Sequence, residues 1–141
     1  MTDQASSRVP PSSEQSRAAA KTVALSELRE AVGYGGMIHQ FKNFIIRRDP
    51  QRLVQARARM EVAASAVAKY RALGLDSDEA RALEAFEKVM TAYANAANVA
   101  EAMVASGKST IEVDAAVKVD DGPAISALNG LDKVKIGRAH V

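Results

Sequence analysis

The chain has 141 residues and nearly balanced charge, with 19 Lys and Arg against 17 Asp and Glu. It contains no Cys and only two His, which excludes a disulfide framework, a cysteine nucleophile and a cysteine-based metal site. No stretch approaches the roughly 18 consecutive apolar residues of a membrane span, and the composition, 48% hydrophobic but only 4% aromatic, favours helices over strands.

Both ends of the chain differ from its middle. Residues 1–16 are rich in Ser, Gln and Pro, and they predict a disordered N-terminal tail. Residues 136–141 match the translation of a sequencing-library adapter. We therefore expect 135–141 to be a non-native scar on a truncated chain. Without Lys135 and Arg138, basic and acidic residues would be equal in number. The folded domain is expected to span residues 17–134.

Glycine and proline positions divide this domain into predicted helical segments. The first segment covers residues 17–48. Asp49 and Pro50 then supply an N-cap and a first-turn proline for a second helix. That helix is expected to end near Leu73, because Gly74 is suited to the left-handed conformation that terminates helices.

Two capping boxes open the remaining segments. Asp76 with Glu79 starts a third helix, and Ser109 with Glu112 starts a fourth segment. An Asp-Asp-Gly-Pro turn at residues 120–123 interrupts that fourth segment, and it is more typical of turn and cap chemistry than of a calcium loop. Four helical segments with short connections predict an all-α fold, an antiparallel up-down-up-down four-helix bundle.

Apolar residues in the second and third helices alternate at spacings of three and four, as in bundle seams. The predicted seam residues are Leu53, Ala56, Met60, Ala63, Val67 and Tyr70 in the second helix and Leu83, Phe86, Met90, Tyr93, Ala97, Ala100 and Val104 in the third. The second helix is predominantly basic and the third predominantly acidic, which favours pairing between them.

The first segment contains an unusual glycine-rich run at residues 33–36. Leu25, Leu28 and Val32 define an apolar face before it, whereas the apolar residues of 37–45 lie on the opposite side. Three glycines in four residues would cost about 2–3 kcal/mol in a helix interior. We expect the helix to break or bend there, or a neighbour to approach the bare backbone.

Continuing the face of Leu28 at helical spacing leads to His39 and Asn43, so both are expected to point into the bundle. The predicted ligand-binding or sensing residues are Gly35, Gly36, His39, Lys42 and Asn43. A core histidine with a satisfied hydrogen bond is the plainer interpretation of His39.

Two segments resemble parts of a known class of proteins. The segment GYGGMIHQFKNFIIRRD, residues 33–49, looks like one found in helical sensory regions of bacterial signal transducers. The segment VDAAVKVDDGPAISAL, residues 113–128, resembles the one that closes those regions, and the likeness spans about residues 22–131. Such regions precede a chemoreceptor signalling domain, a diguanylate cyclase or a histidine kinase, and two membrane helices commonly bound them.

The resemblance implies a non-catalytic sensory input domain of a longer inner-membrane protein, whose sensory region would lie on the periplasmic side. The sequence given shows neither membrane helix and reads as soluble. A small ligand or a protein partner would bias a helix shift that is relayed to a C-terminal output domain. We expect a homodimer, for which Phe41 and Phe44 offer an apolar surface. No cofactor, metal or nucleic acid is expected.

Phosphotransfer is the alternative function. The run His39-Gln40-Phe41-Lys42-Asn43 resembles the phosphoacceptor helices of histidine kinases, although Gln40 stands where an acidic residue is common. A phosphoacceptor imidazole must be exposed. A buried His39 therefore favours sensing, and an exposed one favours phosphotransfer. A purely structural coiled-coil spacer is a third possibility.

Overall fold

The computed structural model describes residues 13–33 and 36–139, with side chains up to residue 133. This part of the chain is all-α and contains no strand, as the sequence predicts. The helices are α2 (Ser13–Val32), α3 (Met37–Arg47), α4 (Pro50–Ala72), α5 (Ser77–Ala105), α6 (Thr110–Ala116) and α7 (Gly122–Ala139).

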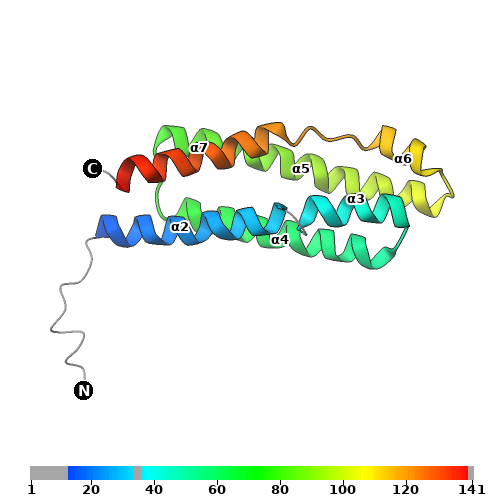
Figure 1. Ribbon diagram of the computed structural model, residues 1–141, viewed down its shortest axis with the longest axis horizontal. Helices are drawn as coiled ribbons and strands as arrows, with labels where there is room; N and C mark the ends of the chain where they lie inside the picture. Colours follow the sequence, from blue (N-terminus) through cyan, green and yellow to red (C-terminus); the bar gives the residue numbers. More distant parts are fainter. Residues whose placement is uncertain (1–12, 34–35, 140–141) are drawn as a thin grey trace, which may run out of the picture.

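The helices form two antiparallel hairpins that pack on each other (Figure 1). In the first hairpin α2 and α3 follow one another in the same direction, and both pack against α4, which returns along them. In the second hairpin α5 is paired with α6 and α7. The two hairpins meet where α4 contacts α5 and where α2 contacts α7.

The predicted helix starts are confirmed. The Asp49 carboxylate accepts a hydrogen bond from the Gln51 N–H, and Pro50 occupies the first turn of α4. Asp76 and Ser109 each form a complete capping box, at the starts of α5 and α6. Gly74 lies just after α4 with a positive φ of 90°, which glycine adopts without the penalty that other residues carry.

The predicted seams of α4 and α5 form the core. All of the predicted seam residues are buried except three, Met60, Met90 and Val104, which are half-buried. Many of the buried positions are alanines, among them Ala56, Ala63, Ala97 and Ala100, and such small side chains let helices approach closely. Opposite charges on α4 and α5 also meet, because Arg57 pairs with Glu101 at 3.0 Å and Arg71 pairs with Glu87.

The predicted first helix, residues 17–48, is two helices. It begins earlier than predicted, at Ser13, and it is interrupted between Val32 and Met37, at the glycine-rich run. The rest of the predicted tail, residues 1–12, lies outside the described residues, as does Gly35. The backbone of α7 continues to Ala139, through most of the segment expected to be a scar.

Among the described residues, no helix combines the length and the apolar character needed to cross a bilayer.

Candidate functional site

The bundle consists of four antiparallel rods: α2 with α3, α4, α5, and α6 with α7. Two of these rods are interrupted, and the interruptions lie next to each other. One separates α2 from α3, and its described residues are Gly33 and Gly36; the other separates α6 from α7 at residues 117–121. Because α2 contacts α7 while α3 contacts α6, the two interruptions occupy the same level of the molecule (Figure 1). We call them the paired interruptions. Their neighbours α4 and α5 run past this level without a break.

The first interruption depends on a close backbone approach at Gly36. The Gly36 N–H donates to the Gly33 carbonyl at 2.8 Å, and Gly36 precedes the first residue of α3. A Cβ on Gly36 would lie 2.5 Å from the Ala31 carbonyl oxygen and 2.8 Å from that of Glu30. A larger residue would therefore push α3 away from the end of α2.

The second interruption is built by turn chemistry at the start of α7. The Asp120 Oδ1 accepts a hydrogen bond from the Gly122 N–H at 3.0 Å. The Asp121 carbonyl accepts from the N–H groups of Ala124 and Ile125, both at 3.1 Å. Aspartates in such turns satisfy backbone N–H groups at a helix start. The described residues contain no cluster of three or more His, Cys, Asp or Glu that could hold a metal ion.

An aromatic pair connects α3 to α5. The rings of Phe41 and Tyr93 meet edge to face, with their centroids 5.7 Å apart. Burial, with a smaller contribution from the charges of Asp121 and Asp120, raises the pKa of the Tyr93 hydroxyl to about 12. This hydroxyl therefore stays protonated at physiological pH, and Tyr93 acts as a packing residue between α3 and α5.

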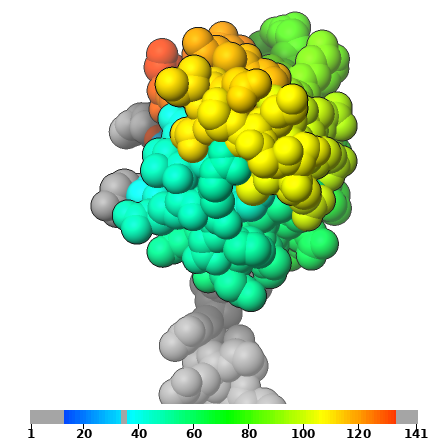
Figure 2. All heavy atoms as spheres, turned by 90° about the vertical axis from the view of Figure 1, so that its right-hand side faces the viewer, coloured from blue at the N-terminus to red at the C-terminus, as the bar shows by residue number. Residues whose placement is uncertain are grey.

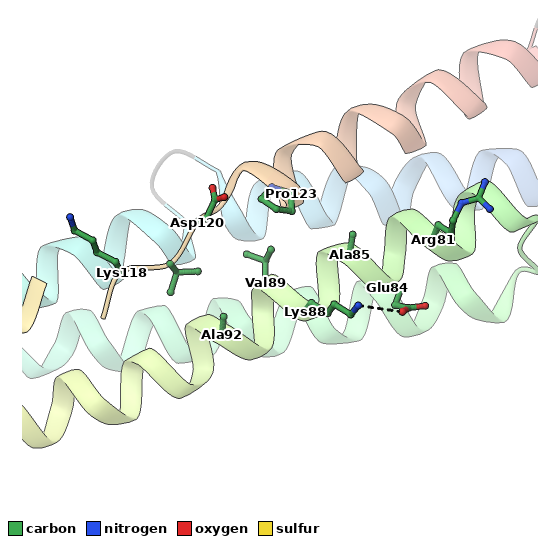
Figure 3. Close-up of a pocket in the computed structure, with 10 residues that line it drawn as sticks. Arg81, Glu84, Ala85, Lys88, Val89, Ala92, Lys118, Asp120 and Pro123 are labelled. Atoms are coloured by element: carbon green, nitrogen blue, oxygen red, sulfur yellow. Dashed lines mark ion pairs between the residues drawn. The ribbon is translucent and has the colours of Figure 1, made fainter. Parts of the chain in front are cut away.

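A groove of about 540 Å³ runs between α5 and the second interruption (Figure 3). Its floor consists of small apolar side chains from α5, and Val119 and Pro123 contribute apolar surface from the other side. Charged residues from both walls surround it: Arg81, Glu84, Lys88, Lys118 and Asp120. No sequence pattern predicts this groove, because it arises only where an irregular segment packs across a helix.

Contacts join the interrupted rods to each other on both sides of the interruptions. Beside the first interruption, Arg29 in the last turn of α2 pairs with Asp132 of α7 at 3.0 Å and donates to the Leu128 carbonyl at 3.4 Å. At the end of the molecule that carries the α3–α4 turn, the Arg48 guanidinium donates to the Lys108 carbonyl, and α3 contacts α6. Figure 2 looks onto this end, where the α3–α4 hairpin and the segment around α6 lie against one another.

The expectation that His39 and Asn43 point into the bundle is wrong for His39 and only partly met by Asn43. His39 and Lys42 are exposed, and Asn43 is only half-buried. The Asn43 Oδ1 accepts a long hydrogen bond of 3.4 Å from the Arg47 Nε, on the same helix. Of the predicted set, Gly36 is buried. The glycine interruption resets the helical phase, so the face that carries Leu25 and Leu28 in α2 does not continue through His39 in α3.

The predicted dimer surface is also wrong. Phe41 and Phe44 are each only 3% exposed, and they belong to the core of the chain itself. Packing within the chain buries both rings, so they are not available to a second copy.

A buried polar cluster that was not predicted lies at the end of the bundle where α4 turns into α5. The Glu79 carboxylate is fully buried, and it accepts hydrogen bonds from Lys21 Nζ at 2.9 and 3.1 Å, from the Tyr70 hydroxyl at 2.7 Å and from the Asp76 N–H at 3.1 Å. Burial alone would raise the pKa of Glu79, but these hydrogen bonds and the charge of Lys21 outweigh it and lower the pKa. The cluster joins α2, α4 and α5.

A signal for this cluster was present in the sequence. Lys21 lies four residues before Leu25, so it continues the buried stripe of Leu25, Leu28 and Val32 toward the N-terminus, where the helix is unbroken.

No protein-family model matches the chain, and no match was found among curated proteins or solved structures.

Proposed function

We propose that the chain is a non-catalytic sensory input domain, an up-down-up-down four-helix bundle that relays binding as a movement of helices. The observation that carries the proposal is the pair of interruptions, which lie side by side in two neighbouring rods while α4 and α5 remain continuous. A bundle that serves only as a spacer does not require two rods to be broken at one level.

The contacts divide the interrupted rods into two pairs. Arg29 ties α2 to α7, and Arg48 with the α3–α6 contact ties the opposite pair together. Each pair lies on the continuous helices α4 and α5. One pair can therefore slide or tilt against the other with little rearrangement within either, and displacements of about 1–2 Å at such packed interfaces are typical of switching proteins.

The resemblance to bacterial sensory regions supports the same interpretation. The first similar segment, residues 33–49, begins at the first interruption, and the second, residues 113–128, contains the second interruption. In this proposal the movement passes from α7 into a C-terminal output domain of a longer inner-membrane protein that acts as a homodimer. The dimer contact lies elsewhere than at Phe41 and Phe44, since both are buried.

Pairs of spin labels test whether α3 moves relative to α2 at the first interruption. The chain has no cysteine, so nitroxides attach only at introduced Cys residues. One pair, at the exposed positions Ser26 and Lys42, spans the first interruption. The control pair, at exposed Gln51 and Ala68, lies within the continuous helix α4 at a similar sequence separation.

We expect the distance distribution of the first pair to be broad or two-peaked and that of the control pair to be narrow. Two equally narrow distributions would contradict the sensory proposal and favour a rigid spacer.

Phosphotransfer is a second candidate, because the exposure of His39 favours it. The imidazole and the Lys42 ammonium are three residues apart on α3 and both face solvent. An acyl phosphate on a partner would be the donor. A ring nitrogen would attack phosphorus, a P–N bond would form, the P–O bond to the acyl group would break, and the carboxylate would leave.

This candidate ranks second because it leaves the paired interruptions without a role. In addition, Gln40 stands where an acidic neighbour is common, and its Oε1 accepts a hydrogen bond from Arg52 at 3.1 Å. Incubation of the chain with acetyl phosphate tests it. An acid-labile phosphoryl group that is present in the unmodified chain and absent from His39→Gln would support phosphotransfer, whereas no modification of either would reject it.

A further inference from the structure

One segment of the fourth rod is attached to the bundle by few side chains. It covers residues 108–121, which include α6 and the second interruption, and it begins directly after Gly107, which has a positive φ of 80° (Figure 1). Within this range only Val113 and Val117 are buried. Ile111 is 82% exposed, so the segment touches the core along one narrow line.

The elements on either side of this segment bury more of their side chains. The buried residues are Met37, Phe41, Phe44 and Ile45 in α3, and Ala124, Ala127, Leu128 and Leu131 in the described part of α7. Ordering the backbone of one residue costs a free energy comparable to what the burial of a small apolar side chain gains. Two valines therefore offset only a small part of the cost of ordering residues 108–121, and the segment is held less firmly than α3 or α7.

Two polar contacts join the segment to the C-terminal end of α3. The Arg48 guanidinium donates to the Lys108 carbonyl, and the Thr110 hydroxyl donates to the Ile45 carbonyl at 3.5 Å. No ion pair joins residues 108–121 to another part of the chain that the structure describes. Water competes for hydrogen bonds near the surface, so the two contacts add little net stability.

We propose that residues 108–121 form a strap that opens and closes as one unit while α7 stays in place. The buried side chains of α7 and the ion pair between Arg29 and Asp132 hold α7 on the bundle. Opening withdraws Val113 and Val117 and uncovers the apolar surface beneath them, where α6 meets α3 and α5. This inference rests on the proposed sensory function for its purpose, because it makes the strap the moving part of the fourth rod.

Native-state hydrogen exchange of the full chain, followed by NMR at several low concentrations of urea, tests the strap. The Val113 N–H lies 3.0 Å from the carbonyl oxygen of the residue that caps α6, so it exchanges only when this turn opens. The amides of Phe41 in α3 and Tyr93 in α5, both buried residues, are the references.

Three variants separate opening of the strap from unfolding of the whole chain. Val117→Ala weakens the docking of the strap, and Ile111→Ala, at an exposed position of the same segment, is its matched control. Glu79→Gln destabilises the bundle through the buried cluster at the start of α5 and leaves the strap unchanged.

We expect the Val113 amide to be protected at least about 100-fold less than the reference amides, with a rate that low urea hardly changes, because a local opening exposes little surface. Val117→Ala should raise this rate about tenfold, since two buried methyl groups are lost, and Ile111→Ala should change it less than about twofold. Glu79→Gln should raise the exchange rates of the reference amides about 100-fold and leave that of Val113 within about twofold.

Equal protection and equal urea dependence of the Val113 amide and the reference amides would overturn the proposal. A Val113 amide that responds to Glu79→Gln, or that does not respond to Val117→Ala, would overturn it as well.

The spin-label pair at Ser26 and Lys42 separates this proposal from the sensory function. Independent opening of the strap together with a narrow distance distribution for the label pair would retain the strap and reject the sensory role. A broad distribution together with a strap that opens only when the whole chain unfolds would reject the strap alone.

Discussion

The ion pair of Lys21 and Glu79 lies in the interior beside Tyr70. An isolated charge would be strongly unfavourable there. Four hydrogen bonds to the Glu79 carboxylate compensate for its burial, and the Lys21 ammonium also lies 5.5 Å from the centre of the Tyr70 ring. A buried ion pair adds little net stability compared with apolar residues, but removing one partner leaves an uncompensated charge. The cluster therefore fixes how α2, α4 and α5 meet.

Glu79→Gln should lower the free energy of unfolding by about 3 kcal/mol, because it leaves the Lys21 ammonium buried without a counter-charge. Urea unfolding followed by circular dichroism measures the change. Adding Lys21→Met to Glu79→Gln should restore part of the loss. Lys69→Ala, which removes the exposed pair with Glu27, should change stability by less than about 1 kcal/mol. A loss below about 1 kcal/mol for Glu79→Gln would contradict this role.

The same cluster predicts a pH dependence. The pKa of Glu79 is lower in the folded chain than in the unfolded one, so its contribution is present above the ordinary glutamate pKa of about 4.3 and is lost as the pH falls through the folded value. The stability difference between the unmodified chain and Glu79→Gln should therefore shrink as the pH is lowered from about 7 to about 3. Urea titrations at several pH values test this, and a constant difference would contradict it.

The contrast between His39 and Lys21 shows what sequence periodicity can resolve at the residue scale. Both lie at positions that continue the stripe of Leu25 and Leu28 in an ideal helix. Lys21 is joined to that stripe by an unbroken helix, so the phase holds and its side chain is buried. His39 lies beyond Gly33 and Gly36, where the helix stops and restarts, so the phase is lost and the side chain is exposed.

At the scale of elements, glycines have opposite roles in the interrupted first rod and in the interior of α7. Gly36 allows a backbone contact with the end of α2 that no side chain would fit, whereas a Cβ on Gly130 would meet nothing within 4 Å. The first glycine shapes an interruption, and the second only makes the unfolded chain more flexible.

Gly36→Ala should destabilise the fold by more than about 1 kcal/mol, because the added Cβ collides with the carbonyl groups of α2. Gly130→Ala should instead stabilise it by about 0.4–1 kcal/mol, since it restricts the unfolded chain at a site with open space. Thermal melts of both variants measure whether each substitution lowers or raises the stability of the fold. Equal effects would show that Gly36 is not held in close contact.

At the scale of the whole molecule, alanine controls how closely the rods approach. Ala63 of α4 and Ala97 of α5 are both fully buried, and the two helices contact each other. Ala63→Leu should therefore cost about 1–3 kcal/mol through overpacking. Ala94→Leu, at an exposed site of α5, should change stability by no more than about 0.5 kcal/mol. Chemical denaturation compares them, and a tolerated Ala63→Leu would mean that the core is loosely packed.

The sequence by itself determined the local features of this protein: the helical class, the caps at Asp49, Asp76 and Ser109, and the seams of α4 and α5. These follow from interactions within a few residues of the chain, which periodicity and capping patterns report directly. The tertiary structure decided the alignment of the two interruptions, the groove between the second interruption and α5, and the meeting of Lys21 with Glu79. Each depends on residues dozens of positions apart, and their placement is set by how whole rods pack.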